Sequence, residues 1–181
     1  MNFKLVACCF LILYPSLIFS QRDTVIKSYD TIVCLKVMGI ALSKKEPIDG
    51  VAISLYRENE ELVWEEITNI PYHDHSFSFD LLGNSNYSIL ISKAGYISRL
   101  VSINTSLPDS VPKSSTPFFF EFEVDLFKEK SAGDDFYLDF PIAIISYNTV
   151  SGVFENHDDY TKHIKEKMFL GIKPKSSTKK K

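Results

Sequence analysis

The feature that most constrains the fold is an alternation of apolar and polar residues within Phe118–Phe127, which is strict from Phe120 to Leu126. Apolar side chains occupy every second position, and Glu121, Glu123 and Asp125 lie between them. Successive side chains of a β-strand point to opposite faces, whereas a helix repeats after three or four residues. The segment is therefore predicted to be a strand with one face in a core, and a second layer must cover that face.

Six other segments show the same pattern less strictly, and turn residues separate them. Gly50 and Gly95 stand where the chain reverses, and glycine takes a positive φ without strain. The segments are 30–42, 51–56, 62–68, 76–82, 87–92 and 97–103. Seven short strands predict a two-sheet antiparallel β-sandwich. The predicted inward residues are Val51, Ile53, Leu55, Phe77, Phe79, Tyr87, Ile89, Phe120, Phe122 and Val124.

The first twenty residues are typical of a signal peptide. Lys4 precedes an apolar stretch, Leu5–Phe19, and Ser20 suits a cleavage site before Gln21. A retained anchor and lipidation of Cys8 are weaker alternatives. The mature protein is expected to be exported, with a periplasmic, surface-associated or secreted location. Cys34 is then its single cysteine, which excludes an internal disulfide and favours a buried, inert thiol.

The charge of the chain is unevenly distributed. Residues 21–170 contain 14 Lys and Arg against 23 Asp and Glu, a net of −9, whereas residues 171–181 contain five Lys and no acid. An acidic body argues against nucleic acid as a partner. The basic tail is predicted to be disordered.

The segment after the predicted sandwich has a different pattern. Residues 128–135 form a charged linker, and 136–170 combine a short apolar strand with a helix that starts near His157. Such an appendage is too small to fold alone, so either the sandwich or a partner must cover its apolar residues. The candidate interface residues are Ile142, Ile144, Tyr160, Ile164 and Met168.

Several of these segments together resemble a known family. The strand 51–55 follows Pro47-Ile-Asp-Gly50, and Tyr87-Ser-Ile-Leu-Ile-Ser-Lys-Ala-Gly-Tyr96 follows the phenylalanine strand 77–81. This order resembles the carboxypeptidase regulatory-like domain, a transthyretin-like sandwich, over roughly residues 30–127. The segment from Leu138 to Ile164 is similar to the tails of exported Bacteroidota proteins that carry such sandwiches. The resemblance implies a bacterial envelope setting.

The sequence predicts no catalytic or metal-binding site. The enzymatic relatives implied by this resemblance are hydroxyisourate hydrolases, and the chain lacks their tyrosine-arginine-glycine-serine end. His73-Asp74-His75 could share an ion if it were a strand, but a structural metal site needs about four ligands. No nucleophile elbow and no phosphate loop occurs, so no catalytic residue, metal or cofactor is expected.

Two function classes remain. The first is a non-catalytic module for protein–protein interaction or assembly in the cell envelope, with an envelope protein as partner. The alternative is a module for carbohydrate or a small ligand, with an aromatic platform made by Tyr56, Trp64 and Tyr72.

Overall fold

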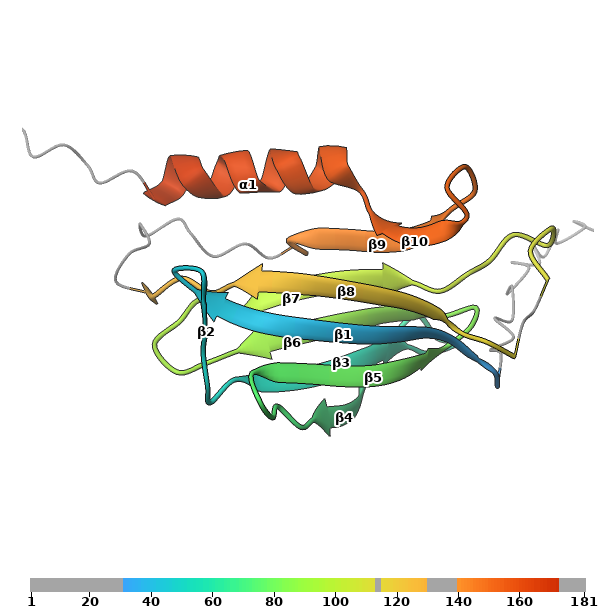
Figure 1. The fold of residues 1–181 in the computed structure, drawn as a ribbon, viewed down its shortest axis with the longest axis horizontal. Helices are drawn as coiled ribbons and strands as arrows, with labels where there is room; N and C mark the ends of the chain where they lie inside the picture. Colours follow the sequence, from blue (N-terminus) through green and yellow to red (C-terminus); the bar gives the residue numbers. More distant parts are fainter. Residues whose placement is uncertain (1–30, 113–114, 130–139, 173–181) are drawn as a thin grey trace, which may run out of the picture.

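A computed structural model describes residues 31–112, 115–129 and 140–172 (Figure 1). The predicted signal peptide, most of the linker and residues 173–181 of the basic tail lie outside the described residues, whereas residues 171 and 172, predicted to be disordered, end the helix Asp158–Ile172. Predictions for the residues outside the described ranges therefore stay predictions.

The first sheet is centred on the long strand β1, Val33–Ser43. Strand β5, Ser76–Leu82, pairs antiparallel with one edge of β1, and β8, Phe118–Asp125, pairs parallel with the other. The two-residue strand β2, Glu46–Pro47, folds back on the end of β1. A parallel pair needs a crossover, and β8 reaches β1 only after the chain has built most of the second sheet.

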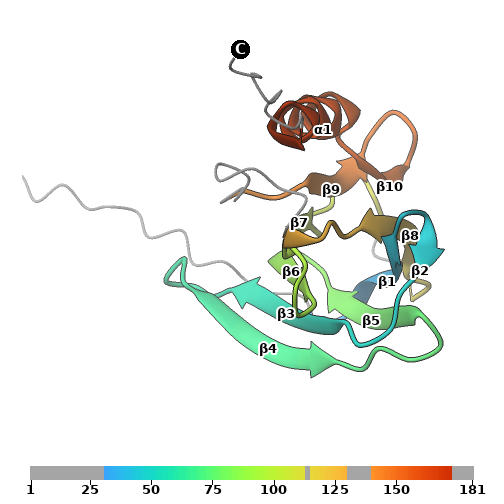
Figure 2. The ribbon, with the colours of Figure 1, turned by 90° about the vertical axis from the view of Figure 1, so that its left-hand side faces the viewer.

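The second sheet has the order β10-β9-β7-β6-β3-β4. Its strands are β3 (Ala52–Glu58), β4 (Trp64–Ile70), β6 (Asn86–Ser92), β7 (Arg99–Asn104), β9 (Ala143–Asn148) and β10 (Val153–Asn156). All neighbours are antiparallel except β7 and β9. Seen end-on in Figure 2, this sheet curves from β4 to β10, with the first sheet on one side of it. The predicted mostly β sandwich with a small C-terminal helix is confirmed.

The core lies between the two sheets and follows the alternation in the sequence. All ten predicted inward positions belong to one continuous core: seven are buried, and Phe79, Phe120 and Phe122 are partly buried. Gly39 on β1 faces the Phe77 ring so closely that a Cβ there would lie 2.2 Å from Cζ. Glycine at this position lets the ring lie flat against the strand.

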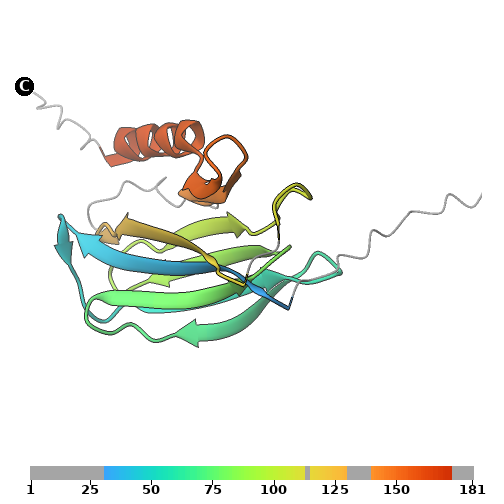
Figure 3. The same cartoon turned by 45° about the vertical axis from the view of Figure 1, so that its right-hand side comes forward.

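The predicted appendage is a continuation of the sandwich. β9 extends the second sheet beside β7, and the hairpin partner β10 follows it. Helix α1, Asp158–Ile172, begins at two acidic residues, as predicted, and contacts β9. Figures 1 and 3 show α1 on the side of β9 and β10, far from β4. Among the described residues, no helix is long and apolar enough to cross a membrane.

Candidate functional site

The outer face of the second sheet carries a row of side chains that crosses four strands. Trp64 on β4 lies opposite Glu58 on β3, and Asn86 on β6 lies opposite Asn104 on β7. The Asn86 amide donates to Glu58 Oε2 at 2.6 Å, and the Asn104 amide donates to Asn86 Oδ1 at 2.7 Å. Directly opposed residues share a face of a sheet. Trp64 therefore lies at one end of a row that continues through the hydrogen-bonded side chains of Glu58, Asn86 and Asn104.

Tyr56 lies on the same face, two residues before Glu58. Its neighbours Ile53 and Leu55 are buried inward, whereas Tyr56 is half-buried and opposes Glu66. Tyr56 and Trp64 therefore belong to one surface, and they are diagonal neighbours within reach of a single ligand.

A second feature of β4 is its apolar exposure. The exposed fractions of Leu62 and Val63, just before β4, are 65% and 52%, and those of Trp64 and Ile67 on β4 are both 46%. We call these four residues the β4 apolar edge. β4 pairs only with β3 among the described strands, so it ends the sheet. A terminal strand offers backbone donors and acceptors to an added strand.

The turn before β4 is held rigidly by Asn59. Its Oδ1 accepts from the backbone N–H of Glu61 at 2.9 Å and of Val63 at 3.0 Å, and its amide donates to Glu65 at 2.6 Å. Leu62 takes a positive φ of 62° within this turn. The apolar side chains are thus presented by a hydrogen-bonded turn.

Glutamates surround the β4 apolar edge. Glu60, Glu61, Glu65 and Glu66 are all exposed, and Glu58 borders them on β3. The local field is therefore negative, which favours a partner with basic residues beside its apolar ones.

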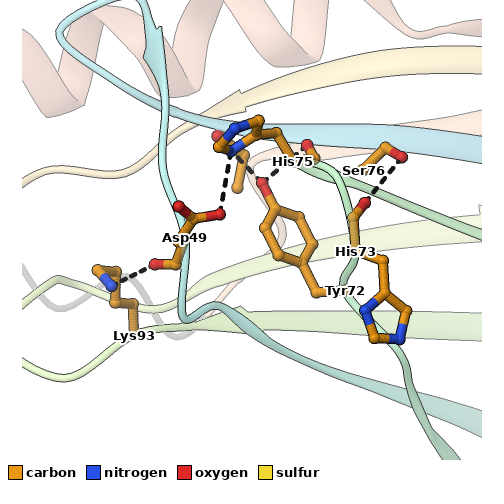
Figure 4. A network of polar contacts seen from close by, with 7 residues as sticks. Asp49, Tyr72, His73, His75, Ser76 and Lys93 are labelled. Carbon is orange, nitrogen blue, oxygen red and sulfur yellow. Dashed lines mark hydrogen bonds and ion pairs between the residues drawn. The ribbon is translucent and has the colours of Figure 1, made fainter.

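Tyr72, the third predicted platform residue, lies elsewhere (Figure 4). Its hydroxyl donates to the His75 carbonyl at 2.8 Å and lies 3.4 Å from the Ala41 carbonyl, and its ring contacts Phe77. Burial raises the pKa of the Tyr72 phenol, and the Asp49 carboxylate acts in the same direction. Tyr72 therefore closes one end of the core and is not part of the surface formed by Tyr56 and Trp64.

The histidine pair is part of a tight hairpin turn. Asp74 and His75 both have positive φ, and His73 and Ser76 exchange backbone hydrogen bonds of 3.0 and 2.9 Å. This geometry fits a type I′ turn. His75 Nδ1 lies 3.1 Å from Asp49 Oδ1, whereas the His73 ring lies apart from it in Figure 4. Within the described ranges, no three His, Cys, Asp or Glu side chains cluster as a metal site would require.

Most of the candidate interface residues make contacts inside the protein. Ile164 is 2% exposed and packs with Ile97, and half-buried Ile142 and Tyr160 join them. The Tyr160 hydroxyl donates to the Pro141 carbonyl at 2.6 Å. Ile144 is half-buried on β9, and the side chain of Met168 lies outside the described part. Ile164 is therefore buried inside the protein, and Ile142 and Tyr160 are partly covered beside it.

One close contact between side chains could not be predicted from the sequence. Ser146 on β9 and His157 before α1 are eleven residues apart, and the β9–β10 hairpin brings Oγ to 2.7 Å from Nε2. The His157 N–H also donates to the Ile144 carbonyl at 2.9 Å. Both contacts fix the start of α1 on β9.

Comparisons with known proteins add little to this geometry. No protein-family model matches the chain, and no curated protein matches it. A solved structure with some similarity is 3-chlorocatechol 1,2-dioxygenase from Rhodococcus opacus 1CP, at 11% identity and a TM-score of 0.35. The match covers 55% of this chain and 61% of the dioxygenase chain, and so it supports no functional argument.

Proposed function

We propose that this protein is a non-catalytic, exported β-sandwich module that binds a partner protein of the bacterial cell envelope through the β4 apolar edge. The observation that carries the proposal is the exposure of four large apolar side chains at the terminal strand of the sheet, Leu62 and Val63 in the turn before β4 and Trp64 and Ile67 on β4 itself. Single exposed apolar residues are ordinary on protein surfaces, whereas a contiguous group on an edge strand is typical of an interaction site.

The geometry favours strand addition as the binding mode. An extended segment of the partner adds to the outer edge of β4, and backbone hydrogen bonds supply affinity. The four glutamates around the edge select a segment in which lysine or arginine alternates with apolar residues.

Trp64 is the one tryptophan of the chain and lies within this surface, so its fluorescence reports binding directly. A peptide of alternating valine and lysine should bind and shift the emission to the blue as the indole loses water. A peptide of alternating valine and glutamate should not.

The matched variants are Ile67→Lys and Phe119→Lys. Both add one lysine at an exposed apolar position, but Phe119 lies on β8, away from β4. Ile67→Lys should abolish the shift, and Phe119→Lys should retain it. Equal shifts with both peptides, or no saturable shift with the lysine peptide, would contradict the proposal.

A second candidate function, carbohydrate binding, is favoured by the row of Glu58, Asn86 and Asn104 beside Tyr56 and Trp64. Aromatic rings stack on sugar faces, and fixed amides bind hydroxyls. A sugar-binding face predicts that Asn104→Ala weakens the response of Trp64 to a bound oligosaccharide. Strand addition predicts that the same variant leaves binding of the valine–lysine peptide unchanged.

A further inference from the structure

A cavity lies between the sheets at the end of the sandwich opposite β4. Its volume is about 340 Å³, which is within the usual range for small-molecule sites, about 300–1,000 Å³. Strand β8 forms one wall, β7 and β9 form the other, and Asn156 and Thr161 border it near the start of α1.

The lining of the cavity is chiefly apolar. The apolar side chains that line it include Val101, Phe120, Phe122, Val124, Ile142 and Ile145. Phe120 and Phe122 point inward from β8, yet both are only partly buried. Two phenylalanines on the core side of a strand are thus left incompletely covered, as expected where the sheets separate around a ligand space.

Three charged residues interrupt this apolar lining: the cation Arg99, and Glu123 and Asp125 on β8. Arg99 occupies the inward row of β7, followed by the buried Val101 and Ile103, and is 1% exposed. Its guanidinium carbon lies 5.2 Å from the centre of the Phe127 ring. Burial lowers the pKa of Arg99 to about 10, and Asp125 opposes that shift, so the side chain is still cationic at neutral pH.

We propose that this cavity binds an amphiphile with an apolar chain and an acidic head group, such as a fatty acid, with the head group directed to Arg99. The apolar walls would take the chain, and a planar guanidinium matches a carboxylate through two parallel hydrogen bonds. The site lies on β7, β8 and β9, so it is separate from the β4 apolar edge and does not depend on the proposed partner binding.

Displacement of a fluorescent fatty-acid probe tests the proposal, with dodecanoate and dodecanol as competitors of equal chain length. Dodecanoate should bind with one molecule per chain, and at least about tenfold more tightly than dodecanol, a difference of about 1.4 kcal/mol. Arg99→Lys should retain most of this preference, and Arg99→Met should remove it. Lys36→Met removes an exposed cation on β1 and should leave the preference for the carboxylate unchanged.

Ala143→Leu fills the cavity without changing Arg99, and it should abolish binding of both competitors while the melting temperature shows that the chain is folded. This variant keeps the proposal testable if Arg99→Met does not fold. Equal affinities for acid and alcohol, or a carboxylate preference that persists in folded Arg99→Met, would overturn the role of Arg99. Failure of the probe to bind, or unchanged binding in Ala143→Leu, would overturn the site.

Discussion

Replacement of Gly39 by alanine should destabilise the sandwich through a single neighbouring ring. An ideal Cβ at position 39 lies 2.2, 2.7 and 2.8 Å from three carbons of Phe77, closer than any real contact. The ring cannot move freely, because it is 2% exposed and packs against Tyr72, Phe79 and Phe122 at centroid distances of 6.3, 6.1 and 5.8 Å.

The expected magnitude follows from two opposing terms. Overpacking a core costs about 1–3 kcal/mol, and alanine recovers at most about 1 kcal/mol through lower flexibility of the unfolded chain. We expect a net loss of about 1–2 kcal/mol, which lowers the melting temperature of a domain of this size by roughly 2–8 °C.

A double-mutant cycle with Phe77→Leu isolates the cause. Leucine lacks the ring atoms that the new Cβ would meet. In the Phe77→Leu protein, Gly39→Ala should therefore reduce the free energy of unfolding by at least about 1 kcal/mol less than it does in the parent. Urea and thermal unfolding of the four proteins measure this coupling. Additive losses, or a Gly39→Ala protein as stable as the parent, would refute the argument.

Three further changes test other parts of the fold. Phe77→Ala removes a buried ring and should lower the free energy of unfolding by roughly 3–5 kcal/mol. Phe122→Ala should lower it by less, because Phe122 borders the inter-sheet cavity, and equal decreases in urea unfolding would contradict this. Deletion of residues 136–181 should lower the melting temperature and increase binding of a hydrophobic dye, because Ile145 and Phe154 are buried in the core; an unchanged melting temperature would contradict their role. Because the pKa of Tyr72 is raised in the fold, the stability linked to its protonated form is present below a pH of about 10 and is lost as the pH rises through the folded pKa. Tyr72→Phe should therefore lose less stability than the parent over that alkaline window, and identical urea midpoints at each pH would exclude this linkage.

The alternation in the sequence was sufficient to locate the seven strands predicted between residues 30 and 127 and most of the core, whereas β2 and β10 were not predicted. Phe118–Phe127 shows why: a period of two assigns each residue to a face whatever the strand pairs with. The turns at Gly50 and Gly95 could also be predicted from local sequence, and both glycines have the positive φ that was expected. The helix start at Asp158 and Asp159 follows from the same kind of local signal.

The sequence could not decide which strands become neighbours. Pairing depends on contacts between distant segments, and the parallel partners β1–β8 and β7–β9 leave no mark in either strand alone. For the same reason Tyr56, Trp64 and Tyr72 look equivalent as exposed aromatics, yet register joins the first two and the His73–Ser76 turn removes the third.

Which surface covers the C-terminal segment was likewise determined only by tertiary contacts. The apolar stripe with Tyr160 and Ile164 shows only that something covers it, and the packing of α1 on β9, Ile97 and Phe127 shows that the covering surface is the sandwich. Arg99 is the clearest case, since a lone arginine in an alternating strand is usually exposed. Its place in an inward row beside a cavity follows from the pairing of β7 with β6 and β9, which no single segment encodes.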